Sequence, residues 1–96
     1  AYLLALLKTD AVMRPLDDPR CPARQDCEAL HAEGLALDFG TSLEAALPVF
    51  DRADVTFLPV VKQVDGVEKL VGALYHVDAL KAYNRALVAV AAEEHS

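Results

Sequence analysis

Long hydrophobic runs, clustered basic residues and glycine-rich loops are all missing from this 96-residue sequence. No apolar stretch approaches the ~20 residues that a membrane-spanning helix needs, and no signal peptide is visible. Nine lysines and arginines stand against fifteen aspartates and glutamates, which gives a formal net charge of −6. This balance argues against nucleic acid as a partner, because phosphate backbones are bound by clustered cations. An anionic small ligand stays compatible with it, since helix N-termini and backbone amides bind anions without net positive charge.

Catalytic patterns are missing as well. The three histidines, His31, His76 and His95, have no local arrangement of nucleophile, base and orienting partner. The four glycines stand singly, so no phosphate-binding glycine loop is present. Adjacent carboxylates at 17–18 and 93–94 are more typical of a solvated surface than of an acid–base pair. We therefore expect a protein that is not an enzyme.

Cysteine is scarce, and its two positions allow more than one interpretation. Cys21 and Cys27 are followed by His31, which would give three metal ligands in the order Cys-x5-Cys-x3-His. Zinc sites usually have closer cysteine pairs and a fourth ligand nearby, and none is obvious here. The simpler interpretation is two ordinary thiols in a loop or short helix of a cytosolic protein. A disulfide is compatible with the pattern but not required by it.

What is present is enough for one domain. Hydrophobic residues make up 54% of the chain, so it can build a core. The chain begins with Ala1 and not with Met, and we expect it to be a segment of a longer protein. Residues 1–40 are predicted to hold a short apolar helix at 2–7, a Val-Met-Arg-Pro lead-in at 12–15 and a strand at 35–39. Between them, residues 16–34 read as an exposed, poorly packed insertion whose helix at 24–32 ends at Gly34. Both of its cysteines are expected to react with a thiol reagent in the folded protein.

Residues 41–92 show the clearest order of elements. Thr41 and Glu44 form a capping box, which predicts a helix that starts there, ends near 53–54 and is kinked by Pro48. A β-rich run at 55–61 contains Pro59, which predicts an edge strand or a break at that residue. Asp65-Gly66 predicts a hairpin turn into a second strand at 70–75, and helical spacing predicts a last helix over 78–92. The polar tail, 93–96, is expected to fray.

This order resembles a CBS domain, the regulatory module named after cystathionine β-synthase. The residues that carry the resemblance are the lead-in at 12–15 and the segments 41–46, 58–61, 65–66, 70–72 and 78–80. The resemblance implies an α+β fold, a single CBS motif in βαββα order with an N-terminal helix and an insertion. It also implies a sensor or dimerisation module that pairs with a second copy. The apolar residues expected to form that homodimer are Leu47, Phe50, Leu80, Tyr83 and Leu87.

The resemblance places a ligand at the end of the second strand. The family pattern Gly-x-x-Thr-x-x-Asp corresponds to Gly72, Tyr75 and Asp78, so the aspartate is kept and the threonine is lost. Asp78 is then either a ribose-binding carboxylate or only a favourable charge in the first turn of a helix. His76 would meet a phosphate when protonated, or is simply exposed. An adenine slot lined by Phe57, Leu58, Pro59 and Val60 is implied, unless these residues are only core. The implied ligands are AMP, ADP, ATP and S-adenosylmethionine.

The end of the chain extends the resemblance. Residues 78–87 look like the tail of the second CBS motif in bacterial chloride channels or transporters of the ClC type. This implies the cytoplasmic, soluble part of an inner-membrane protein, with a membrane domain and a second copy as partners. Cation-efflux proteins, nucleotide-biosynthesis enzymes and stand-alone modules are other carriers. The alternative function is a ligand-free dimerisation or assembly module.

Overall fold

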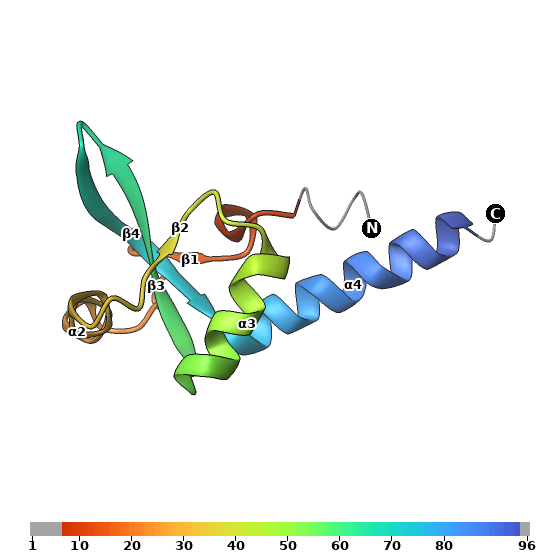
Figure 1. Cartoon of the computed structure of the whole chain (residues 1–96), viewed down its shortest axis with the longest axis horizontal. Coiled ribbons are helices and arrows are strands. Elements are labelled where there is room, and N and C mark those ends of the chain that lie inside the picture. The colour runs from red at the N-terminus through yellow and green to blue at the C-terminus, as the bar shows by residue number, and fades with distance from the viewer. Residues whose placement is uncertain (1–6, 95–96) are drawn as a thin grey trace.

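A computed structural model describes residues 7–94 and shows a four-stranded sheet with helices on it (Figure 1). The helix expected over 2–7 falls, except for Leu7, outside the described residues, as does the end of the tail, 95–96. Among the described helices, none is both long enough and apolar enough to cross a membrane.

The sheet has the strand order β1-β4-β3-β2. Strands β3 (Phe57–Val64) and β4 (Val67–Tyr75) form an antiparallel hairpin, with β2 (Leu37–Asp38) parallel to β3 and β1 (Arg14–Pro15) antiparallel to β4. Asp65 and Gly66 make the turn with φ angles of 52° and 79°. Two consecutive positive φ angles match the right-handed twist of the hairpin, as the Asp-Gly pair predicted. The predicted βαββα order is therefore present from β2 to the last helix.

Strand β3 corrects the expectation that Pro59 marks an edge strand. It lies between β4 and β2, and Pro59 is fully buried. Proline is tolerated because β2 is only two residues long and pairs with Val60 and Val61, one residue after Pro59. The missing N–H therefore costs no bond to β2. The predicted irregularity occurs one step later, as a register shift between Val60 and Val61.

Helix α3 (Leu43–Ala53) begins one residue later than the capping box predicted. Ser42 is the N-cap, and its Oγ accepts a hydrogen bond from the Ala45 N–H at 3.3 Å. The capping box at Thr41 is therefore wrong, since the Thr41 carbonyl is held by the backbone N–H and hydroxyl of Thr9, both at 2.8 Å. The helix continues through Pro48 and ends, as predicted, at 53–54, where Asp54 is left-handed with φ 53°.

The core lies where α3 and the last helix, α4 (His76–Glu94), pack together on the sheet. Phe50 is 1% exposed and stacks on the His76 ring, with centroids 4.7 Å apart and an interplanar angle of 8°. The expectation that Phe50 offers apolar surface to a second copy is thus wrong, because its side chain fills this core. The buried cluster consists of Leu37, Leu43, Ala46, Phe50, Leu58, Val60, Leu74 and Ala79.

The insertion is better packed than predicted. Helix α2 (Arg24–Ala32) has the predicted bounds, and Gly34 follows it with φ 81°. However, α2 contacts β3 and β4, and Cys27 is 0% exposed. Pro59 and Val61 alternate with the core residues of β3 and are buried too, so both faces of this strand need a cover. Because α2 helps to bury the sheet, the prediction of a poorly packed segment with two reactive thiols is wrong for Cys27.

Candidate functional site

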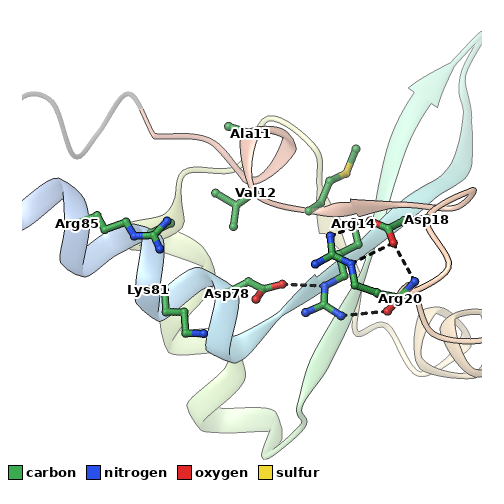
Figure 2. A pocket seen from close by; sticks show the side chains of 10 residues that line it. Ala11, Val12, Arg14, Asp18, Arg20, Asp78, Lys81 and Arg85 are labelled. Carbon is green, nitrogen blue, oxygen red and sulfur yellow. Dashed lines mark hydrogen bonds and ion pairs between the residues drawn. The ribbon is translucent and has the colours of Figure 1, made fainter.

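A cationic cavity of about 480 Å³ lies beside the first turns of α4 (Figure 2). Its volume is within the range of about 300–1,000 Å³ that is usual for small-molecule sites. The walls come from three segments that are distant in sequence: the chain before β1, the turn after it, and one face of α4. The lining residues are Ala11, Val12, Met13, Arg14, Asp18, Arg20, Asp78, Lys81, Ala82 and Arg85.

The wall that carries Arg14 is held by two close approaches of the backbone. The 3₁₀ helix η1 (Thr9–Ala11) is anchored at Thr9, which is buried and bound to the Thr41 carbonyl. Next to it, β1 lies directly against Gly72 of β4. A Cβ atom at Gly72 would stand 2.4 Å from the Arg14 carbonyl oxygen, so only glycine permits this approach. The glycine of the predicted motif therefore positions the arginine.

Arg14 is the central cation of the cavity. Its Nε donates to Asp78 Oδ2 at 2.9 Å and its Nη1 donates to the Arg20 carbonyl at 3.1 Å. The guanidinium carbon also lies 4.0 Å from the centre of the Tyr75 ring. The side chains of Arg14 and Asp78 are 20% and 25% exposed, so both are accessible from the cavity. These three contacts fix the orientation of the Arg14 guanidinium. Its planar set of N–H donors matches the oxygen atoms of a phosphate or a carboxylate.

Arg20 is held by the turn that contains Asp18. The Asp18 carboxylate accepts from the Arg20 backbone N–H at 2.8 Å and from its Nη2 at 3.2 Å. These hydrogen bonds lower the pKa of Asp18 and raise that of Arg20, so the pair is charged at neutral pH.

The charges of the cavity favour an anion. Four cationic side chains and two carboxylates line it, which leaves an excess of two positive charges in a chain whose net charge is −6. Asp78, Lys81 and Arg85 are spaced by three and four residues, so they share one face of α4. The backbone amides of the first turn add a partial positive charge at the same end of the helix. The cavity can therefore bind a phosphate beside a carboxylate that accepts from hydroxyl groups.

The predicted site residues are divided among different places. Asp78 lines the cationic cavity, whereas Tyr75 and His76 line a separate, mainly apolar cavity of about 420 Å³ with Val77 and Leu80. The Tyr75 ring packs on Phe57, at 5.7 Å between centroids, and His76 is occupied by its stack on Phe50. Leu58, Pro59 and Val60 are fully buried. An adenine slot formed by these three side chains is not open in this structure.

The sequence interpretation missed Arg14, Arg20, Lys81 and Arg85. Two signals were available: Arg14 stands inside the Val-Met-Arg-Pro segment, and Lys81 and Arg85 follow Asp78 at helical spacing. The insertion shows no comparable site. His31 Nε2 lies 3.0 Å from Glu68 Oε1, and within residues 7–94 no three His, Cys, Asp or Glu side chains are grouped so as to hold a metal ion.

Comparison with known proteins supports the fold. No protein-family model and no curated protein matches the sequence. Among solved structures, the chain is similar to CBSX2, whose crystal structure was determined in complex with AMP. The TM-score is 0.58 at 15% identity, over 82% of this chain and 97% of that chain. An identity this low establishes the fold alone. The chain has a CBS-type fold of mixed α and β structure, with the size of a single motif, as the resemblance predicted.

Proposed function

We propose that this chain is a regulatory module that senses an adenine nucleotide in the cationic cavity. The observation that carries the proposal is that Arg14, paired with Asp78, lines one cavity together with Lys81 and Arg85 of α4. The cations bind the phosphate, and Asp78 accepts hydrogen bonds from the ribose hydroxyls. Arg14 exchanges at least part of its bond to Asp78 for the phosphate. The likeness to a CBS protein crystallised with AMP gives independent support.

The adenine base is expected to bind away from the buried residues of β3. Leu58, Pro59 and Val60 have no accessible surface to offer it. Val12, Met13 and Ala82 line the same cavity as the cations and are the apolar contacts within reach. In this proposal Tyr75 does not contact the phosphate. Its ring makes a cation–π contact with the Arg14 guanidinium and so helps to hold that side chain in place.

Calorimetry with AMP, ADP, ATP and S-adenosylmethionine tests the proposal. We expect at least one adenine nucleotide to bind, and adenosine to bind at least about tenfold more weakly because it lacks the charge-assisted bonds of a phosphate. Arg85→Ala should weaken nucleotide binding several-fold, while Lys69→Ala, an exposed cation on the hairpin, should leave it unchanged. Absence of heat with all four ligands would contradict nucleotide sensing.

The proposal also concerns the parent protein to which this module would be attached. The resemblance of residues 78–87 to the tail of ClC-type proteins supports a membrane ion channel or transporter as the parent, with this module on the cytoplasmic side. The module would then report nucleotide levels to a membrane domain.

A ligand-free assembly module is the second candidate function, and one observation favours it. Helix α4 leaves large apolar side chains exposed: Val77 by 51%, Leu80 by 42%, Leu87 by 41% and Val88 by 69%. Such a stripe on one helix is typical of an interaction surface, and a second copy of the chain would cover it with two-fold symmetry.

The dimer is testable by light scattering at micromolar concentration. We expect the mass of two chains, and we expect Leu80→Asp to convert the dimer to a monomer because it places a charge in the apolar contact. Val67→Asp is the matched control, since Val67 is 59% exposed but lies on the hairpin. A parent protein that is monomeric at this concentration would contradict the proposal of an assembly module.

A further inference from the structure

A groove of about 440 Å³ lies between α2 and the segment that joins α3 to β3. In Figure 1, α2 is on the opposite side of the sheet from α4, which carries the cationic cavity. One wall of the groove is a single face of α2, because Asp26, Leu30 and Glu33 follow one another at helical spacing. The other wall consists of Asp54, Val55 and Phe57. The groove therefore exists because the insertion packs against β3.

The floor of the groove is mainly apolar. Leu30, Val55 and Phe57 are all half-buried. Val55 also packs against the core cluster, and the Phe57 ring packs on the Tyr75 ring with 5.7 Å between centroids. These contacts hold both side chains in place. A surface that is already ordered can accept an apolar side chain without paying for its own ordering.

The rim of the groove is negatively charged. Three exposed carboxylates stand on it: Asp26, Glu33 and Asp54. Within residues 7–94, none of the three is in an ion pair. The described lining residues include no lysine or arginine. Two cations close in sequence are used elsewhere, since Arg24 pairs with Glu28 at 3.1 Å and Arg52 lines a different cavity.

Two helix C-termini add to this charge. Glu33 is the C-cap of α2, and Asp54 is the C-cap of α3. The last carbonyl groups of a helix carry a partial negative charge, which favours a cation nearby. The groove is therefore the electrostatic opposite of the cationic cavity, where the start of a helix meets arginine and lysine side chains.

We propose that this groove docks a basic peptide segment of a partner protein. An apolar side chain of the peptide lies on the floor, and lysine or arginine side chains on either side of it meet the carboxylates of the rim. A second copy of this chain is a poor occupant, because its net charge is −6. The groove is separate from the cationic cavity and from the exposed stripe of α4, so the proposal does not rest on nucleotide binding.

Fluorescence anisotropy of a labelled peptide, measured with the full chain, tests the docking. The probe is a short peptide of leucine and lysine with its leucines on one face of a helix, and we expect it to bind saturably. A peptide of serine and lysine with the same charge should bind at least about tenfold more weakly, because it buries no leucine. Absence of saturable binding by the first peptide, or equal binding of the two, would overturn the proposal.

Two charge reversals show whether the rim is the docking site. Asp26 and Glu44 are both exposed acids in the first turn of a helix, but Glu44 is at the opposite end of α3 from the groove. Asp26→Lys should weaken peptide binding by roughly fivefold or more, because an attraction becomes a repulsion. Glu44→Lys, the matched control, should leave it unchanged, and circular dichroism checks that both variants fold. Equal losses in the two variants would overturn the proposal, because the peptide would then respond only to net charge.

Backbone amide NMR spectra locate the peptide on the protein. The signals of Leu30, Glu33 and Val55 should shift when the leucine–lysine peptide is added, while that of Lys69, on the hairpin, serves as the reference. Shifts at Leu80 without shifts at these three residues would place the peptide on α4 and would overturn the proposal. None of these measurements uses a nucleotide, so their outcome is separate from that of the calorimetry.

Discussion

Replacement of Gly72 by alanine is expected to lower the free energy of unfolding by about 1–3 kcal/mol, the usual cost of forcing extra volume into a packed site. The new methyl carbon would stand 2.4 Å from the Arg14 carbonyl oxygen and 3.2 Å from the Pro15 Cα. Both are backbone atoms, so no side chain can rotate away, and β1 must leave its place beside β4. Urea unfolding followed by circular dichroism measures the change.

The same substitution should also weaken nucleotide binding, because β1 carries Arg14 into the cavity. Gly40→Ala is the matched control: its methyl group would meet only the Asp38 side chain, at 3.2 Å, and Asp38 is exposed. We expect the control to stay within about 0.5 kcal/mol of the parent protein, as surface substitutions usually do. Equal urea midpoints for Gly72→Ala and Gly40→Ala would contradict the close approach of β1.

Replacement of Asp78 by alanine is expected to weaken nucleotide binding strongly and to leave the fold intact. A hydrogen bond to a charged group contributes about 1.5–3 kcal/mol, so the loss of the ribose contact should weaken binding by about ten- to a hundredfold. The stability cost should be on the order of 1 kcal/mol, from the first-turn charge and a partly exposed ion pair with Arg14. Calorimetry and urea unfolding on the same samples separate the two effects.

Asp51→Ala is the control for Asp78→Ala, since it removes an exposed carboxylate from the end of α3, outside the cavity. Its nucleotide affinity should equal that of the parent protein. If Asp78→Ala binds nucleotide as well as the parent protein does, the ribose contact lies elsewhere. In a parent protein that binds none of the four ligands, Asp78 would be only the favourable helix-start charge.

Local patterns predicted most elements because local physics forms them. The Asp65-Gly66 turn needs two left-handed residues in succession, which this pair supplies at low cost. The bounds of α2 and the end of α3 also agreed with the structure. The start of α3 did not, because Ser42 and Thr41 are both residue types that cap helices. The choice depends on Thr9, a residue 32 positions away whose side chain engages the Thr41 carbonyl.

The candidate site was predicted only in part for the same reason. Asp78 could be recognised from its position after Gly72, but its partner Arg14 is 64 residues away. No periodicity or turn signal links two residues at that separation. The adenine slot predicted along β3 depended on which face of the strand is covered. Apolar residues on both faces of β3 made that question undecidable from sequence. In the structure α2 contacts β3, and Leu58 and Val60 are buried in a cluster with residues of α3 and α4.

The sequence by itself determined the order of elements, the hairpin turn, the resemblance to a CBS domain and the net negative charge. These follow from residue spacing, turn chemistry and charge, which act over a few neighbouring positions. Only the tertiary structure decided that β3 is an interior strand, that Cys27 is buried, and that Arg14 meets Asp78. Each of these depends on the packing of segments distant in the chain, where the close approach of β1 to Gly72 fixes what the side chains can reach.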